Sequence, residues 1–299
     1  MLTLDKIYQA SFVLKHVLHT TELIQAPKLC PGCDLYLKPE NLQVTGSFKV
    51  RGAYFKMSQL TPEEKAAGVI ACSAGNHAQG VALAARENGI KAQICIPDGA
   101  PISKVEATKS YGAEVVLVKG VYDDAYAKAI ELQKEQGSTF LHPYDDEDVI
   151  AGQGTIGLEI LTQMDDLDAV IVPIGGGGLI SGVAFAVKSL NPKVKVYGVQ
   201  AAGAPSMYRS IQQHEQLTLD SVATFADGIA VKHPGDLTYQ ICSKYVDEIV
   251  TVTDDEIATA ILALIEKHKM IAEGAGAVAV AAAMFDKVDL QGKDAVCVV

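Results

Sequence analysis

The chain has 299 residues, of which 49% are hydrophobic and 20% are charged, and its formal net charge is -11. This balance is typical of a globular enzyme with one large or two moderate domains, and it excludes a disordered or fibrous chain. The charge is spread along the chain without a Lys/Arg block, which argues against nucleic acid or an anionic membrane as a partner and favours a small ligand.

The amino-terminal segment 1–18 carries charged residues in its first turns and lacks the uninterrupted apolar core of a signal peptide. No uncharged apolar run in the sequence has the length needed to span a bilayer. We therefore expect a cytoplasmic protein. The six cysteines suit a reducing compartment, and CPGC at 30–33 is interpreted as a plain turn, with a metal or redox half-site as the alternative.

The stretch TGSFKVRGAYF at 45–55 places two cations, Lys49 and Arg51, among residues suited to burial. Taken alone, a lysine in such an amphipathic segment is an exposed, solvated side chain. The alternative is an amine held in a pocket for chemistry, and the loops farther along the chain bear on that choice.

Short runs rich in valine and isoleucine alternate with longer amphipathic stretches along the rest of the chain. Buried strands are predicted at 68–72, 92–97, 113–118, near 139, and at 169–174, 194–199, 248–253 and 294–299. Helices are predicted at 76–89, 123–137, 179–190 and 254–268. This alternation predicts an α/β fold of two open, mostly parallel twisted sheets with helices on both faces.

The predicted strands fall into two groups along the chain. We expect a small, mobile domain at 59–145 inserted into a larger domain made of 1–58 and 146–299. The boundary is placed in the polar stretch 142–155, which contains Pro143.

Candidate chemistry is sought directly after strands, because ligands of open parallel sheets bind at the carboxyl ends of their strands. Gly175, Gly176, Gly177 and Gly178 follow the strand at 169–174 and precede a helix, which predicts a phosphate cradle of backbone N–H groups. The alternative is a tight turn. No Walker Gly-Lys-Ser/Thr follows, and the next strand lacks the acidic residue of a dinucleotide site, so ATP and NAD are both disfavoured.

A second loop, SAGNHAQG, places Ser73, Gly75, Asn76 and His77 between a strand and a helix. Side-chain oxygens and free N–H groups at a helix start form a receptor for a carboxylate or phosphate. The alternative for Ser73 by itself is a helix cap. Together with these two candidate anion sites, Lys49 becomes a candidate Schiff-base amine. A lysine combined with a phosphate cradle, without the sequence features of a nucleotide site, indicates pyridoxal 5'-phosphate as the cofactor.

The motifs GSFKVRGA, SAGNHAQG, GGGGL, ADGIAV and EGAGA together resemble the fold-type II pyridoxal-phosphate enzymes, whose fold is tryptophan-synthase-β-like. Within them the resemblance is to the catabolic threonine dehydratase and serine racemase group, and it runs through essentially all 299 residues. It implies a threonine ammonia-lyase, which converts L-threonine to 2-oxobutanoate and ammonia by β-elimination followed by hydrolysis, and converts L-serine to pyruvate and ammonia in the same way.

Residue by residue, the resemblance makes Lys49 the Schiff-base lysine that also removes the Cα proton, with Phe48 beside the cofactor ring. It implies that Asn76 contacts the pyridoxal 3-hydroxyl. The other implied roles are phosphate contacts from Gly175, Gly176, Gly177, Gly178 and Leu179, substrate-carboxylate contacts from Ser73, Gly75, Asn76 and His77, and cofactor lining by Gly228 and Glu273.

Two positions distinguish subgroups of the resembled family. Serine racemases carry a second serine where this chain has Ala74, so a dehydratase is favoured and a racemase is the alternative. Their divalent-metal ligand is a glutamate where this chain has Gln200, so no required metal is expected. The non-enzyme alternative is a nucleotide- or phospholigand-binding module, which leaves Lys49 without a role.

In the resembled family the strand matching 294–299 continues into Ser-Gly-Gly-Asn, whose serine meets the pyridine nitrogen, and we expect that segment beyond Val299. The resemblance further implies a homodimer or homotetramer, and a nucleotide or amino-acid effector. It places the activity in amino-acid catabolism and in isoleucine biosynthesis.

Overall fold

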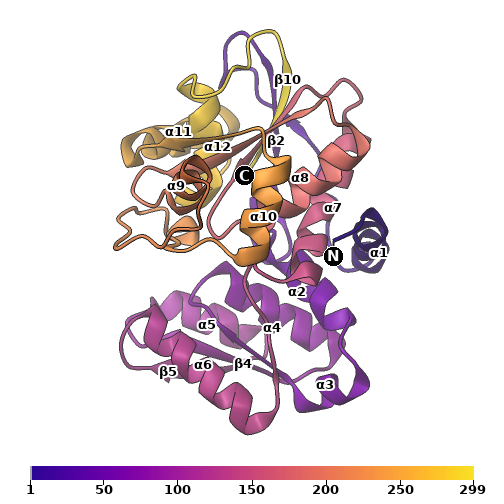
Figure 1. Ribbon diagram of the computed structural model, residues 1–299, viewed down its shortest axis with the longest axis vertical. Coiled ribbons are helices and arrows are strands. Elements are labelled where there is room, and N and C mark those ends of the chain that lie inside the picture. The colour runs from indigo at the N-terminus through magenta and orange to yellow at the C-terminus, as the bar shows by residue number, and fades with distance from the viewer. Residues whose placement is uncertain (1) are drawn as a thin grey trace.

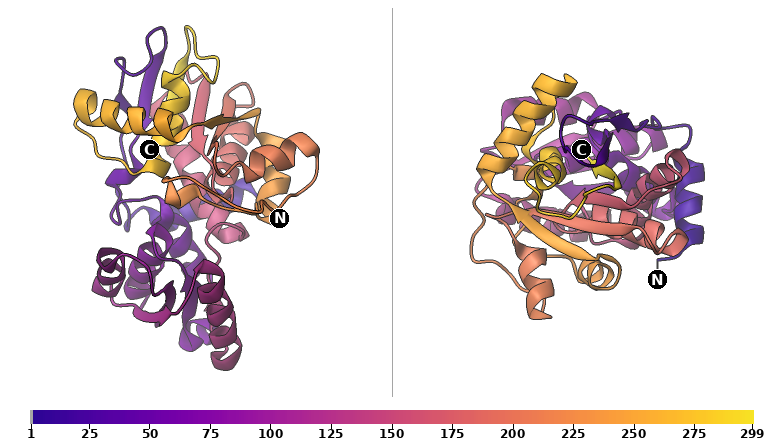
Figure 2. Two further views of the ribbon diagram at one scale, coloured as in Figure 1. Left: turned by 90° about the vertical axis from the view of Figure 1, so that its left-hand side faces the viewer. Right: turned by 90° about the horizontal axis from the view of Figure 1, so that it is seen from above.

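The computed structural model describes residues 2–299, which form two parts joined at a waist (Figures 1 and 2). One part is built on a six-stranded sheet in the order β1-β2-β10-β7-β8-β9, and the other on a four-stranded sheet in the order β5-β4-β3-β6. Every neighbouring pair of strands is parallel except β1 and β2, which are antiparallel.

The large sheet draws its strands from both ends of the chain. They are β1 (Ile24–Gln25), β2 (Asp34–Lys38), β7 (Ala169–Pro173), β8 (Lys195–Ala201), β9 (Glu248–Val252) and β10 (Asp294–Val298). Along β7 the buried side chains alternate between two cores: Ala169 and Ile171 face one, and Val170 and Val172 face the other. Burial on both faces explains why this strand is a continuous apolar run.

Helices cover both faces of the large sheet. On one side lie α7 (Glu147–Gln163), α8 (Gly178–Leu190) and α10 (Asp236–Tyr245), and on the other α11 (Asp254–His268) and α12 (Gly274–Met284). Helix α12 is apolar all round because it is buried between the sheet and α11. The remaining elements of this part are α1 (Leu4–Leu14), η1 (Glu40–Leu42), α9 (Ser206–Gln213) and η2 (Asp227–Ile229).

The small sheet consists of β3 (Val69–Cys72), β4 (Ala92–Pro97), β5 (Glu114–Val118) and β6 (Thr139–Phe140). Helices α4 (Asn76–Asn88) and α5 (Ile102–Ser110) contribute to the core on one face, and α6 (Tyr122–Gln136) packs on the other. Helices α2 (Lys49–Ser58) and α3 (Pro62–Ala67) connect the first strands of the large sheet to β3.

The predicted fold class is confirmed, and the predicted strands and helices agree with the observed ones to within about two residues at each end. The short antiparallel edge formed by β1 was not predicted. Residues 147–155, expected within a polar boundary, are instead the start of α7, whose acidic first turn is capped by Asp146. Acidic residues favour a helix amino terminus, so this charge marks a helix start.

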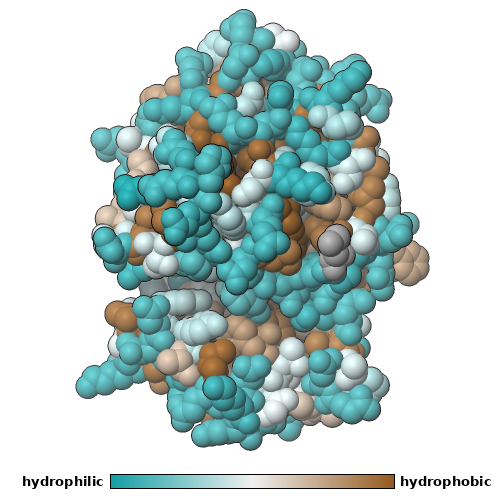
Figure 3. Space-filling model, viewed as in Figure 1, coloured by the Kyte–Doolittle hydropathy of each residue, from teal (hydrophilic) through white to brown (hydrophobic). Residues whose placement is uncertain are grey.

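The proposed division at 59–145 stays a prediction. Helix α2 packs against both parts: Ala53 lies in the core of the small sheet, and Gly52 N donates to Gln153 Oε1 of α7. The predicted turn at CPGC is observed, and all six cysteines are free thiols. Hydrophilic residues cover most of the face in Figure 3, and no helix within residues 2–299 is long and apolar enough to cross a bilayer.

Candidate active site

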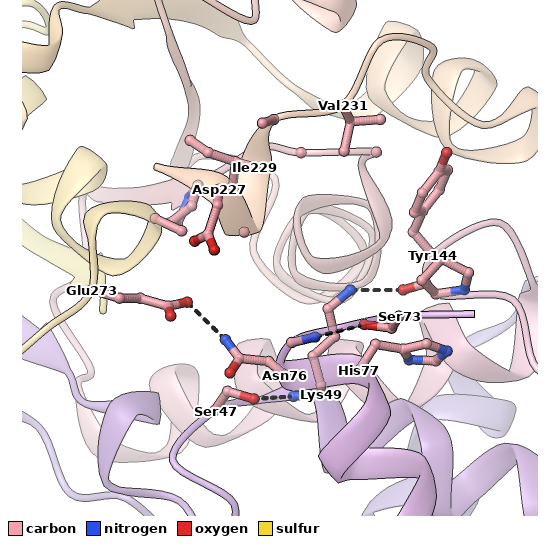
Figure 4. Close-up of a pocket in the computed structure, with 18 of the residues that line it drawn as sticks. Ser47, Lys49, Ser73, Asn76, His77, Tyr144, Asp227, Ile229, Val231 and Glu273 are labelled. Atoms are coloured by element: carbon pink, nitrogen blue, oxygen red, sulfur yellow. Dashed lines mark hydrogen bonds between the residues drawn. The ribbon is translucent and has the colours of Figure 1, made fainter. Parts of the chain in front are cut away.

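A cavity of about 790 Å³ lies between the two parts, where the carboxyl ends of strands from both sheets meet. The glycine loop after β7, the asparagine loop after β3 and Lys49 all line it (Figure 4). The structure therefore brings together the three stretches that the sequence singled out separately. All the predicted site residues, including Phe48, Leu179, Gly228 and Glu273, lie in its wall.

Lys49 is the first residue of α2, and its side chain points into the cavity (Figure 4). Its Nζ donates a hydrogen bond to the Pro143 carbonyl at 2.8 Å and lies 5.4 Å from the centre of the Phe48 ring. Burial lowers the pKa of the amine to about 8, and the partly opposing influence is the charge of Glu273. With this pKa about one tenth of the amine is unprotonated at pH 7, far more than for an ordinary lysine, so it can act as a base or nucleophile.

The second cation of the segment, Arg51, is buried behind the cavity wall. Its guanidinium bonds to both carboxylate oxygens of Glu40 at 2.8 Å, and to both oxygens of Glu159 at 2.6 and 3.0 Å. Lys38 is buried in the same network through Glu159 at 2.6 Å. These pairs tie α2 to β2, η1 and α7, and they hold the start of α2, where Lys49 lies, against the large sheet.

The glycine loop connects β7 to α8 and passes close to other segments of the same chain. Gly177 has φ of +100°, in the left-handed region that favours glycine. A Cβ at Gly176 would lie 2.4 Å from the Tyr144 ring, and one at Gly178 would lie 2.8 Å from Tyr144 Cβ. Within residues 2–299 no side chain caps α8, so the N–H groups of its first turn are open to an anion in the cavity.

The asparagine loop leads from β3 to α4, whose N-cap is Gly75. Ser73 Oγ accepts a hydrogen bond from Gly75 N at 3.1 Å, and Asn76 Nδ2 donates to Glu273 Oε1 at 2.7 Å. The bond between Asn76 and Glu273 joins the two parts across the cavity (Figure 4). Burial raises the pKa of Glu273, against the opposing influence of the Asn76 hydrogen bond.

The His77 ring forms a hydrogen bond with Leu141, the residue after β6 of the small sheet. Its Nε2 donates to the Leu141 carbonyl at 3.0 Å, the residue is 4% exposed, and burial followed by the charge of Lys49 lowers the pKa of the ring to about 3. The ring is therefore neutral and supports the loop. The predicted contact with a substrate carboxylate remains a prediction for this position, and only its backbone is suited to it.

Two parts of the site escaped the sequence reasoning. Pro143 and Tyr144 follow β6 and form a wall between Lys49 and the glycine loop. Their place directly after a strand is the signal by which the sequence could have identified them. The other is an ion pair at 2.6 Å between Lys104 of α5 and Asp227 of η2, which joins the two parts at the cavity.

Gln200, which replaces a metal-binding glutamate of the resembled subgroup, is fully buried beside α9. Its Oε1 accepts from Tyr208 N at 2.8 Å, and its Nε2 donates to the Ile174 carbonyl at 3.4 Å. In the part of the chain that the structure describes, no group of three His, Cys, Asp or Glu side chains has the arrangement of a metal site. The absence of a metal requirement stays a prediction.

Comparison with known proteins gives consistent matches. The sequence profile of the family described as pyridoxal-phosphate dependent enzymes matches residues 14–299. The L-threonine ammonia-lyase of Thermotoga maritima is 52% identical over 301 residues, which cover 100% of this chain and 75% of that protein. The catabolic L-threonine dehydratase of Escherichia coli K12 is 52% identical over 260 residues, covering 87% of this chain and 79% of that protein.

Solved structures give the same picture. Serine racemase from maize superimposes with a TM-score of 0.95 at 35% identity, covering 99% of this chain and 92% of that one. The processed form of threonine deaminase isoform 2 from Solanum lycopersicum superimposes with a TM-score of 0.92 at 40% identity, covering 98% of this chain and 88% of that one.

The residues present fit the cofactor of that family. Pyridoxal phosphate needs an amine for its aldehyde, donors for its phosphate and an enclosed volume for its ring. Lys49 offers a half-buried amine whose pKa is lowered to about 8. The glycine loop offers a helix start without a side-chain cap, and it lies so close to Tyr144 that a Cβ at Gly176 would overlap the ring. Within a cavity of about 790 Å³ there is room for cofactor and amino acid together.

Proposed function

This chain belongs to the family of pyridoxal-phosphate-dependent enzymes, and from that premise we propose that it is an L-threonine ammonia-lyase that also accepts L-serine. The single observation that carries the proposal is the desolvated Lys49 amine facing the glycine loop across one cavity. Relatives named as threonine ammonia-lyase and threonine dehydratase at 52% identity supply the substrate class.

When bound, pyridoxal phosphate supplies an aldehyde that bonds to amines and a conjugated ring that stores carbanion charge. The chain supplies the proton transfers. Elimination removes a proton from Cα and hydroxide from Cβ of the amino acid, and water then releases ammonia. The products are 2-oxobutanoate from threonine and pyruvate from serine.

Lys49 is proposed as the residue that bonds the cofactor and that carries the Cα proton. An amine can accept that proton only in its neutral form, and the lowered pKa of about 8 makes this form available. The backbone carbonyl of Pro143, 2.8 Å from Nζ, orients the amine toward the cavity. Such orientation matters because a misplacement of about 1 Å costs about 100-fold in rate.

The asparagine loop is proposed to hold the substrate carboxylate. Ser73, Gly75 and the start of α4 face the cavity, and α4 has no side-chain cap within the described residues. The positive end of the helix dipole therefore favours an anion at this place. Asn76 and Glu273 close the cavity from the two sides, and Gly228 leaves room for Glu273, since a Cβ there would lie 3.2 Å from Glu273 Oε1.

A second candidate is serine racemisation, which the likeness to maize serine racemase favours. Inversion needs a proton carrier on each face of Cα. Ala74 lines the cavity between Ser73 and Gly75 and offers no hydroxyl there, so we favour elimination. The binding-module alternative gives Lys49 no task and is set aside.

The other expectations are kept as proposals. We infer catabolism from the names of the relatives, and a role in isoleucine biosynthesis stays a prediction. A cytoplasmic location, a homodimer or homotetramer, a nucleotide or amino-acid effector, and a small domain at 59–145 that moves on ligand binding stay predictions as well.

The test is turnover by the purified protein supplemented with pyridoxal phosphate. We expect a visible absorption band that borohydride abolishes, with the reduced label on Lys49, and 2-oxoacid formation from L-threonine and L-serine. Lys49→Ala should lose the band and turnover, whereas Lys15→Ala, at an exposed lysine of the same charge, should keep both. A protein without the band and without 2-oxoacid would refute the proposal, and substantial D-serine from L-serine would favour the racemase.

A further inference from the structure

The turn 142–145 leads from β6 of the small sheet toward α7 and forms one wall of the cavity. His142 Nδ1 lies 3.3 Å from Tyr144 N and 2.8 Å from Asp145 N. Both amides donate, so Nδ1 accepts both bonds and carries no proton. Asparagine and aspartate side chains commonly close turns in this way, by accepting from amides two and three residues ahead. Here an imidazole nitrogen takes the place of the side-chain oxygen.

Two residues inside this turn contact the catalytic groups. The Pro143 carbonyl accepts the hydrogen bond of Lys49 Nζ at 2.8 Å. The Tyr144 ring lies against the glycine loop so closely that a Cβ at Gly176 would be 2.4 Å from it. The position of the turn therefore sets the direction of the Lys49 amine and the shape of the phosphate loop at once.

The last residue of the turn extends the connection to α10. The Asp145 carboxylate accepts from Asp236 N at 3.0 Å, Leu237 N at 2.9 Å and Thr238 N at 3.2 Å. The Thr238 hydroxyl in turn donates to the Gly176 carbonyl at 2.6 Å. The turn therefore holds the glycine loop in two ways: directly through the Tyr144 ring, and indirectly from Asp145 through Thr238.

We propose that His142 is a positioning residue for Lys49 and the glycine loop, acting through the two bonds that its Nδ1 accepts. The ring also packs edge-on against Tyr144 at 4.6 Å and against Phe140 at 6.2 Å between ring centres. The ring packing of His142 and the hydrogen bonds that its Nδ1 accepts can be tested separately. A phenylalanine at this position keeps a flat ring but has no hydrogen-bond acceptor, whereas an asparagine keeps an acceptor but has no ring.

The surroundings of His142 agree with an accepting, neutral ring. Burial lowers its pKa, Asp145 and Asp146 oppose that effect, and Lys49 adds to it. The ring of His77 is neutral too, because its pKa is lowered to about 3. At neutral pH, Nδ1 is therefore free to accept from both amides.

The first experiment is hydrogen exchange at the amides of Tyr144 and Asp145 in cofactor-free protein, comparing wild type, His142→Asn and His142→Phe. We expect protection at both amides in wild type and His142→Asn, and loss of protection in His142→Phe. This measurement needs neither cofactor nor turnover, so it tests the contact even if the proposed function fails.

The second experiment rests on the proposed function and measures kcat and KM for L-threonine. We expect His142→Phe to lose about 10- to 100-fold in kcat with a smaller change in KM, because the Lys49 amine is misdirected at the proton-transfer step. His142→Asn should stay within about threefold of wild type in kcat, well inside the loss that misplacement causes.

The opposite result would overturn the proposal in favour of ring packing: His142→Phe would keep its kcat and the protection of the Tyr144 and Asp145 amides, and His142→Asn would lose both. Equal activity and exchange in all three proteins would overturn it too. If His142→Phe does not fold, as judged by its thermal transition, His142→Gln replaces it. The glutamine amide is one carbon farther from the backbone and cannot close the same turn. A comparison of His142→Gln with His142→Asn therefore still shows whether the accepted hydrogen bonds matter.

Discussion

Replacing Gly176 by alanine tests whether the Tyr144 ring really shapes the glycine loop. The added Cβ would lie 2.4 to 2.5 Å from three carbons of that ring. An ordinary contact begins near 3.4 Å, so ring and loop must separate by about 1 Å. The ring is not free to swing away, because its hydroxyl bonds to the His233 carbonyl and its edge packs on His142.

The expected cost follows from two opposing effects. Overpacking of this kind costs about 1–3 kcal/mol. Gly176 is not among the glycines with positive φ, so alanine adds no backbone strain and lowers the entropy of the unfolded chain, a gain of about 0.4–1 kcal/mol. We expect a net loss of about 1–2 kcal/mol in the free energy of unfolding. A comparable strain in the loop weakens pyridoxal phosphate binding by about tenfold for each 1.4 kcal/mol.

The assay is urea unfolding of the cofactor-free protein together with a cofactor titration, run as a double-mutant cycle with Tyr144→Ala. In the Tyr144→Ala background the ring is gone and Gly176→Ala should be close to neutral. Gly99→Ala is the matched control, because nothing lies within 4 Å of its added Cβ, and it should leave both measurements unchanged or slightly improved.

A Gly176→Ala protein with wild-type stability and cofactor affinity would refute this reasoning. So would a loss of the same size in the presence and absence of the Tyr144 ring, because the obstacle would then lie elsewhere.

Three further predictions concern ionisable side chains. Arg51→Leu leaves the Glu40 carboxylate buried without its guanidinium and should cost about 3–5 kcal/mol in urea unfolding, and Glu40→Gln in the same background should recover part of it; full stability of Arg51→Leu would contradict this. Burial lowers the pKa of His77 to about 3, so the unfolded chain binds the extra proton as pH falls from 6.5 toward 3; stability should fall by up to about 1.4 kcal/mol per pH unit, and His77→Gln should have a flatter profile. The pKa of Lys49 is lowered to about 8, so acylation of this residue in cofactor-free protein, followed by peptide mass spectrometry, should be half-maximal near pH 8, and a midpoint above about pH 10 would contradict its burial.

Local patterns were sufficient for every strand except β1 and β2, for helices α4, α6, α8 and α11, and for the main candidates of the site. Strands buried on both faces, such as β7, appear as short apolar runs because every side chain enters a core. The glycine run and the asparagine loop were found because each directly follows a strand, where parallel sheets bind ligands. The same local reasoning missed the start of α7 at 147–155, where acidic residues mark a helix amino terminus.

The sequence by itself determined the α/β alternation and the two loops that are candidates for anion binding, and these loops in turn made Lys49 a candidate Schiff-base residue. Only the tertiary structure decided what each side chain faces: Arg51 pairs with Glu159, 108 residues away, and Asn76 reaches Glu273, 197 residues away. It also paired the His77 ring with the Leu141 carbonyl and the Lys49 amine with the Pro143 carbonyl. The physical reason is that periodicity reflects which face of a single element is buried. These contacts depend instead on how the two sheets and their helices pack against each other, and local sequence spacing does not encode that packing.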